Sequence, residues 1–298
     1  MIKRIITMGN FDGCHLGHQA LFREMKKDAE ELGMIPTVVS FEPHTNYVLR
    51  SYGDPLLLTT TEEKEEFVRS LDLDFISLPF TRDLAALPFD EFVRTELCAK
   101  LNMGAMYFGH DHNFGRAGAG NYESISAAFP ELKTKQLSIV LHKGERISSS
   151  AVRNALLNGD VARAQTYLGR SYRLIGRIVT GKQLGRTIGF PTANLEVPDC
   201  KFIPRHGVYA ASARLVDGRV FRAVVNIGTQ PSVGDMPLRI EAHLLNFSGN
   251  LYDSHFSLDL LEFLRPERKF ASLDELKRQI ASDAALAADF QSSFSDMT

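Results

Sequence analysis

The sequence of 298 residues lacks the features of a protein that crosses a membrane or leaves a reducing compartment. It has no apolar run near the ~18–20 residues that a membrane-spanning helix needs. Its first residues, MIKRIITMGNFDG, contain no apolar segment typical of a signal peptide. Its three cysteines, Cys14, Cys98 and Cys200, are far apart and odd in number, which fits neither a disulfide framework nor a zinc site. These absences predict a cytoplasmic protein without a membrane partner.

A surplus of basic residues is also absent. The chain has 34 Lys and Arg against 36 Asp and Glu, whereas proteins that bind nucleic acid usually have a basic surplus. We therefore expect no nucleic-acid partner. The chain has no internal repeat, and its length exceeds that of one average domain, so two domains are expected.

In the first part of the chain, short β-rich runs alternate with helical patterns. Gly33 is a residue type favoured just past the end of a helix, and Thr60 with Glu63 has the spacing of a capping box. This alternation predicts a parallel sheet with helices on both faces and a ligand site beyond the carboxyl ends of its strands. Strands are expected at 5–8, 37–41, 75–78, 105–108 and 137–141, and helices at 16–32, 62–71 and 90–101.

The pattern changes near Tyr172. Apolar and polar residues alternate on either side of Asp217-Gly218, which is a hairpin signal, and further short strands with turn residues follow. This pattern predicts an antiparallel barrel or sandwich. A capping box at Ser272 begins a last helix, with Leu276, Ile280 and Leu286 as its apolar stripe. We place the domains at residues 1–168 and 169–298.

The first motif, Gly9-Asn10-Phe11-Asp12-Gly13-Cys14-His15-Leu16-Gly17-His18, lies where a strand gives way to a helix. Glycines let the backbone approach a ligand, and free amides at a helix start attract an anion. His15 and His18 are three residues apart and can face one site. We interpret them as imidazoles beside phosphate rather than as zinc ligands. The alternative is a polar turn with two solvated histidines.

The second motif is Arg146-Ile147-Ser148-Ser149-Ser150-Ala151-Val152-Arg153. Its serines start a helix, and Arg153 one turn later would strengthen an anion site. Read alone, the motif fits a plain helix cap. Together with the first motif, at the end of the same sheet, it would form the second half of a site for a nucleoside triphosphate.

The third motif, Gly181–Asn194, lacks the spacing of a Walker loop. Its glycines and small polar groups can still cradle phosphates, and Thr192 and Asn194 offer the neutral oxygens that magnesium accepts. The alternative is an irregular glycine-rich loop. On a later strand, alternation places Glu241 and His243 on the face opposite Ile240, Ala242 and Leu244. Glu241 could act as a general base there, or be an ordinary surface glutamate.

These motifs, together with Phe41-Glu42-Pro43-His44, resemble in their order the bacterial bifunctional riboflavin kinase/FMN adenylyltransferase (FAD synthetase) family. The resemblance covers nearly the whole chain. Its IGFPTAN loop is rare outside riboflavin kinases, whereas the HxGH string is shared across nucleotidyltransferases. The resemblance implies an α/β fold: a Rossmann-like HxGH nucleotidyltransferase domain with a parallel sheet, then an antiparallel β-barrel riboflavin kinase domain with a C-terminal helix.

The resemblance further implies two reactions that use ATP. Riboflavin is phosphorylated to FMN, and FMN is then adenylylated to FAD with release of pyrophosphate. His15 and His18 would contact the triphosphate, Glu241 would be the kinase base, and Mg²⁺ would bind at Thr192 and Asn194. The remaining implied site residues are Gly9, Asn10, Phe11, Asp12, Gly17, Ser148, Ser149 and Arg153 for ATP in the first domain, and Gly181, Gly185, Gly189, Pro191, Thr192 and Asn194 for ATP or flavin in the second.

The chain departs from the family in the loop Gly109–Gly115, where Asp111 and Phe114 are expected to contact flavin or nucleotide. His112 stands where relatives usually have an aromatic residue, and it either packs as a ring or points to solvent. Two other functions stay open: a riboflavin kinase with a degenerate adenylyl domain, and a flavin-binding regulator without catalysis. The oligomeric state stays open as well.

Overall fold

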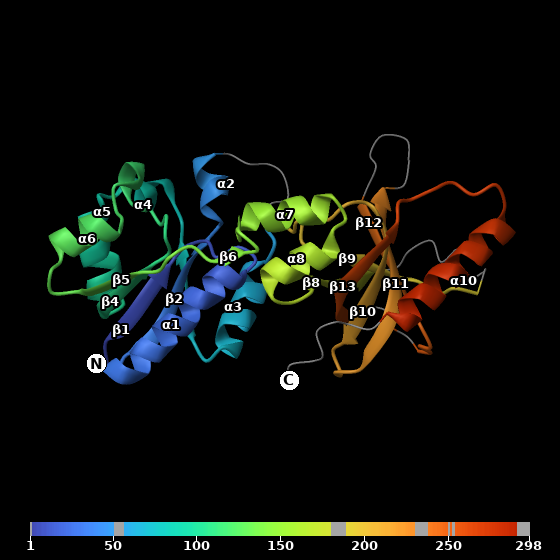
Figure 1. Cartoon of the computed structure of the whole chain (residues 1–298), viewed down its shortest axis with the longest axis horizontal. Coiled ribbons are helices and arrows are strands. Elements are labelled where there is room, and N and C mark those ends of the chain that lie inside the picture. Colours follow the sequence, from blue (N-terminus) through green and yellow to red (C-terminus); the bar gives the residue numbers. More distant parts are fainter. Residues whose placement is uncertain are drawn as a thin grey trace. The chain divides into compact units, whose positions relative to one another are not determined.

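The computed structural model describes residues 2–50, 57–179, 189–229, 238–249, 251 and 254–290. The chain forms two compact units, Met1–Ser149 and Ser150–Thr298, which we describe separately (Figure 1).

The first unit is built on a five-stranded parallel sheet with the strand order β3-β2-β1-β4-β5. Neighbouring residues of β1 supply opposite faces: Ile5 packs with residues of α1 and α3, whereas Ile6 packs with the segments around Phe92 and Ile125. The predicted parallel sheet with helices on both faces is therefore confirmed. Its elements are β1 (Arg4–Met8), α1 (Leu16–Leu32), β2 (Ile35–Glu42), α2 (Thr45–Leu49), α3 (Thr61–Ser70), β3 (Asp74–Pro79), α4 (Arg82–Ala86), α5 (Phe89–Phe92), the π-helix η1 (Val93–Lys100), β4 (Met103–Phe108), the 3₁₀ turn η2 (Arg116–Gly118), α6 (Tyr122–Ala128), β5 (Lys133–Gln136), β6 (Leu141–His142) and β7 (Glu145–Arg146).

The local end signals act as the sequence predicts. Gly33 has a φ of 61°, a left-handed conformation that glycine adopts without steric cost, and its N–H bonds to carbonyls of the last turn of α1. Both bonds of the capping box between Thr60 and Glu63 are present at the start of α3.

One predicted strand is wrong. The fifth strand is not 137–141 but Lys133–Gln136, which pairs with β4 from Ala105↔Lys133 to Phe108↔Gln136. The apolar run beyond it leaves the sheet, with Ile139 and Leu141 39% and 57% exposed. Because β5 is an edge strand with one free side, it accepts polar residues, and the hydrophobic pattern does not mark it.

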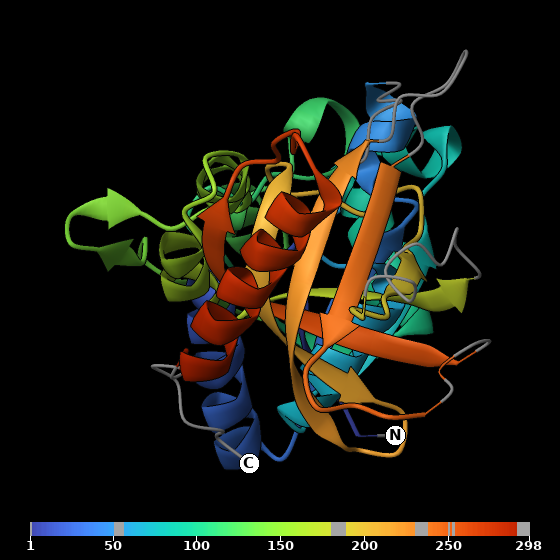
Figure 2. The same ribbon diagram turned by 90° about the vertical axis from the view of Figure 1, so that its right-hand side faces the viewer.

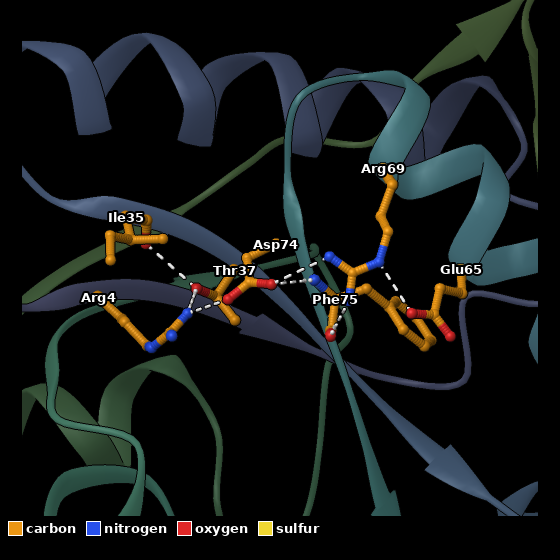
Figure 3. A network of polar contacts seen from close by, with 7 residues as sticks. All are labelled: Arg4, Ile35, Thr37, Glu65, Arg69, Asp74 and Phe75. Carbon is orange, nitrogen blue, oxygen red and sulfur yellow. Dashed lines mark hydrogen bonds and ion pairs between the residues drawn. The ribbon is translucent and has the colours of Figure 1, made fainter.

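A polar network ties together the amino ends of three neighbouring strands (Figure 3). Arg4 on β1 donates to Thr37 on β2 at 2.8 Å and pairs with Asp74 on β3. Arg69 reaches Asp74 at 3.4 Å and Glu65 at 2.8 Å. The network lies at the amino edge of the sheet. The loops at the opposite, carboxyl edge take no part in it.

The second unit contains a closed antiparallel barrel with the strand order β10-β11-β12-β9-β8-β13. The predicted hairpin at Asp217-Gly218 joins β10 to β11, with Arg214 opposite Val220. A barrel rather than a sandwich is therefore the fold, and the C-terminal helix lies against β10 and β11 (Figure 2). Its elements are α7 (Ser149–Leu157), α8 (Val161–Leu168), β8 (Tyr172–Val179), β9 (Ala193–Glu196), β10 (Gly207–Leu215), β11 (Val220–Thr229), β12 (Leu238–Leu244), β13 (His255–Arg265) and α10 (Leu273–Asp289).

The packed stripe of α10 differs from the prediction at one position. Leu286 is 56% exposed, whereas Asp283 and Ala287 are buried. The Asp283 carboxylate accepts from the Arg265 guanidinium at 2.8 Å and from Gln279 at 2.7 Å. A charged residue can lie in the stripe because β13 supplies its counter-charge, which a sequence pattern does not reveal.

We expect Asp283→Asn to destabilise the second unit. Removing one partner of a fully buried ion pair costs about 3–5 kcal/mol. Here Asp283 is buried but Arg265 is partly exposed, so water can compensate part of the remaining charge. The free energy of unfolding, measured with urea, should therefore fall by a smaller amount, about 1–2 kcal/mol. The control is Asp289→Asn on the same helix, where the side chain is exposed. Equal effects of the two substitutions would contradict this role of the pair.

His112 packs as a ring within the first unit. Its imidazole lies 5.9 Å from the Phe108 ring and 5.8 Å from the Phe114 ring, both in edge-on geometry. It is half-buried, so it does not simply point to solvent. Burial lowers the pKa of His112 to about 4, because the surroundings disfavour the imidazolium.

This pKa predicts an acid-sensitive fold. The unfolded chain takes up a proton at His112 near its ordinary pKa of ~6.5, whereas the folded chain does so only near pH 4, so stability is lost as the pH falls from 6.5 to 4. At pH 5 the loss should reach at most about 2 kcal/mol. His112→Phe should remove it, measured as the difference in unfolding free energy between pH 7 and pH 5. His110→Gln, at an exposed neighbour, is the control. An unchanged difference in His112→Phe would contradict the assignment.

Candidate functional site

The loop between β1 and α1 is buried and strained rather than a solvated turn. Asp12, Cys14 and His15 are each less than 7% exposed. Phe11 and Cys14 have φ angles of 45° and 41°, in a region that costs a non-glycine residue about 1–3 kcal/mol. Such strain persists only where surrounding contacts enforce it, and it is common in ligand-binding loops.

The two histidines stack on each other. Their ring centroids are 3.6 Å apart with an interplanar angle of 20°, and Phe11 meets His18 edge-on at 5.2 Å. Gly17 makes this arrangement possible, since a Cβ there would lie 3.1 Å from the His15 ring. The HxGH spacing therefore produces two adjacent imidazoles that can address one anion.

The second motif reaches the first through Ser149. Its hydroxyl donates to the Asp12 carbonyl at 2.8 Å. Asp12 itself accepts from the Thr59 N–H at 3.2 Å, and the Thr59 hydroxyl accepts from the Gly13 N–H at 3.0 Å. Asp12 thus supports the loop as well as lying in it. Ser148 precedes Ser149, and Arg153 lies one turn further along α7.

Asn10 is tied to the segment that follows β2. Its side chain accepts from the Thr45 N–H at 3.2 Å and donates to the Thr45 hydroxyl at 2.8 Å. The loop end Gly9 donates to the Val39 carbonyl at 3.0 Å. These bonds fix the amino end of the motif, while the Ser149 bond fixes its middle.

Lys64 is a residue that the sequence reasoning missed. It is 3% exposed, and its ammonium donates to the Ser40 hydroxyl at 2.9 Å. Burial lowers the pKa of Lys64, and the nearby Cys14, Asp12 and Glu42 offset part of that effect. It therefore places a buried basic group beside the loop that precedes His15 and His18. The available signal was its spacing, four residues before the buried Val68 on α3.

The loop after β4 has one polar and one packed residue at the predicted positions. Asp111 accepts from the Arg146 guanidinium at 2.6 Å, which lowers the pKa of its carboxyl. Phe114 packs at 5.8 Å from Phe92 in the core. Asp111 is accessible to a ligand, whereas Phe114 mainly supports the loop.

In the barrel, three polar residues align across neighbouring strands. Asn226 on β11 pairs in register with Glu241 on β12, which pairs with Asn194 on β9. Their neighbours Ile240, Ala242 and Ala193 are buried, so the row lies on the outer face of the barrel. Glu241 is half-buried, with Arg239 3.9 Å from its carboxylate. Register thus brings Glu241 and Asn194, which the sequence places 47 residues apart, side by side.

A second carboxylate that the sequence reasoning missed lies near this row. Glu267, which follows β13, accepts from the Asn226 amide at 3.2 Å. Gly228 leaves room for it, since a Cβ there would meet the Glu267 carboxylate at 2.1 Å. No sequence signal within β11 indicates this contact, because Glu267 comes from a distant segment.

The residues that could hold magnesium are neutral. Thr192 directly precedes β9 and Asn194 lies on it, both half-buried. Among the described residues, no group of three His, Cys, Asp or Glu could hold a metal ion. Hydroxyl and amide oxygens completed by substrate phosphates suit Mg²⁺, so the donors fit. Gly189 and Pro191 lie in the same loop, and Gly181 and Gly185 lie outside the described residues.

No helix in the described ranges is both long and apolar enough to cross a membrane. Two family models match the chain: FAD synthetase over residues 2–151 and riboflavin kinase over residues 168–291. The fold is also similar to a crystal structure described as a macrolide-efflux protein from Streptococcus pneumoniae, with a TM-score of 0.90, 28% identity and coverage of 97% of this chain and 95% of that one.

Curated relatives match along almost the whole length. A bifunctional riboflavin kinase/FMN adenylyltransferase of Haemophilus influenzae is 35% identical over 96% of this chain and 93% of its own. The proteins of the same name from Escherichia coli and Bacillus subtilis are 35% and 33% identical, over 96% and 94% of this chain and 92% and 90% of theirs. With both domains matched and their motif residues in place, the chain belongs to the bifunctional riboflavin kinase/FMN adenylyltransferase family.

Proposed function

We propose that this chain phosphorylates riboflavin with ATP to FMN and then joins FMN to the AMP part of a second ATP, giving FAD and pyrophosphate. The observation that carries the proposal is that each unit gathers its own motif residues: the stacked His15 and His18 in one, and the Glu241–Asn194 row in the other. We assign adenylylation to residues 1–168 and phosphorylation to residues 169–298, and we place the enzyme in the cytoplasm.

In the adenylyl site, the FMN phosphate is the nucleophile at the α-phosphorus, so no covalent enzyme intermediate is needed. His15 and His18 donate hydrogen bonds to the oxygens on which charge develops. Ser148, which precedes α7, together with Ser149 and Arg153 on that helix, holds the leaving phosphates. Positioning and electrostatics supply the rate.

In the kinase site, Glu241 takes the proton of the ribityl 5′-hydroxyl as that oxygen attacks the γ-phosphorus of ATP. Thr192 and Asn194 would hold Mg²⁺, which when bound neutralises phosphate charge. Asn194 lies opposite Glu241, so the β9–β12 register sets the spacing between base and phosphate donors.

The test is to incubate the protein with riboflavin, Mg²⁺ and ATP and to separate the flavins by chromatography. FAD is expected. FMN alone would indicate a kinase with a degenerate adenylyl domain, and unchanged riboflavin would indicate a flavin-binding regulator.

We predict that His15→Ala or His18→Ala lowers FAD formation while FMN formation stays near that of the wild type. Loss of one donor to transition-state charge costs ~10²–10³ in rate. The kinase activity of the same preparation is the internal control. A parallel loss of both products would show that the two sites are not separate.

We predict that Glu241→Gln lowers FMN formation by ~10²–10⁴, the usual contribution of a general base, while the variant still adenylylates supplied FMN. The matched control is Glu267→Gln, which removes the other carboxylate near the row. If Glu267→Gln abolishes phosphorylation and Glu241→Gln does not, Glu267 is the base instead.

A further inference from the structure

We propose that His243 is a positioning residue that holds the loop carrying Thr192 by a hydrogen bond to the Pro191 carbonyl. The proposal rests on the proposed kinase site. It assigns a role to a side chain that would not itself touch the reacting atoms.

The His243–Pro191 bond lies just beyond the point where the backbone pairing of β12 with β9 ends. β12 pairs with β9 at Glu241↔Asn194 and Ala242↔Ala193, and the next position would pair His243 with Thr192. There the backbone pairing ends. Instead, His243 Nδ1 lies 2.8 Å from the Pro191 carbonyl oxygen. Proline has no N–H to donate, so its carbonyl oxygen is the backbone group through which Pro191 can be tied to β12, and the His243 side chain bonds to it.

The chemistry of the bond defines the imidazole. A carbonyl oxygen only accepts, so Nδ1 must carry the hydrogen. A neutral His243 is therefore the Nδ1–H tautomer. The Phe190 ring meets the imidazole edge-on at 5.4 Å and 79°, which fixes the plane of the ring. Thr192 is thus held on both sides: Pro191 and Phe190 before it contact His243 on β12, and Ala193 after it pairs with Ala242 on the same strand.

One strand then controls two parts of the site. Glu241 and His243 are two residues apart on the same face of β12, so the spacing between the base and the Thr192 loop follows from strand geometry. A displacement of a reacting group by about 1 Å can cost ~10²-fold in rate. Loss of the His243 bond should therefore act on phosphorylation without removing a catalytic group.

The test compares His243→Asn with His243→Gln and His243→Leu. The Asn amide nitrogen occupies the position of Nδ1 and can donate to Pro191, whereas the Gln amide lies one bond further out and Leu cannot donate. Expected kcat/KM values for riboflavin phosphorylation are within about threefold of the wild type for Asn and lower by ~10–10²-fold for Gln and Leu. Adenylylation of supplied FMN should be unchanged in all three. Gln activity equal to Asn activity would overturn the proposal, even if Leu fails to fold.

A second readout needs no substrate. Long-range ¹H–¹⁵N correlation spectra of the full chain with labelled histidine, assigned by comparison with His243→Asn, should show protonated Nδ1 and unprotonated Nε2. The opposite tautomer would overturn the proposal. The Glu241→Gln assay tests the proposed kinase site separately from the role of His243. Normal phosphorylation by Glu241→Gln would rule out Glu241 as the base. The tautomer of His243 and the difference in activity between His243→Asn and His243→Gln test only the role of His243.

Discussion

The hydrogen bond from Ser149 to the Asp12 carbonyl joins segments 137 residues apart in sequence, and the shape of the loop that precedes His15 and His18 depends on it. The loop before α1 keeps Phe11 and Cys14 in costly backbone conformations. Bonds from Ser149, Thr59 and Thr45 hold that loop from three directions. Without these hydrogen bonds the loop would relax to less strained backbone angles, and His15 and His18 would no longer be held in their stacked arrangement.

The His15–His18 loop of the first unit and the Glu241–Asn194 row of the second differ in the charge of the groups they bring together. The first gathers hydrogen-bonding and basic groups, with the buried Lys64 side chain near Asp12 and Cys14 and the two stacked imidazoles at the start of α1, as suits a triphosphate. The barrel row presents two carboxylates, Glu241 and Glu267, beside the amides of Asn194 and Asn226, with the Arg239 guanidinium 3.9 Å from Glu241. A carboxylate can accept a proton, whereas it repels phosphate unless a cation lies between them. The two groups of residues therefore suit the two different reactions proposed above.

Much of this could be predicted from sequence because the signals were local. Caps at Gly33 and Thr60, the alternation of β10 and β11 and the HxGH spacing each depend on residues a few positions apart. The misses have distant causes. Polar β5 is recognisable only as an edge of the assembled sheet, and Asp283 packs only because Arg265 faces it. Lys64 and Glu267 lie near the sites through tertiary contacts that no periodicity encodes.

Closure of the barrel has a consequence for how this site can change. In an open sheet an outer strand can slip by two residues and keep its buried face. In a closed sheet the stagger is shared by every strand, so a slip of β12 would have to be repeated around the whole ring. The alignment of Glu241 with Asn194 is thus a property of all six strands, and no single strand can drift out of it. Core residues of the barrel can be exchanged for others of similar volume while this alignment holds. The interior can therefore change in sequence without moving Glu241 relative to Asn194 on the outer face.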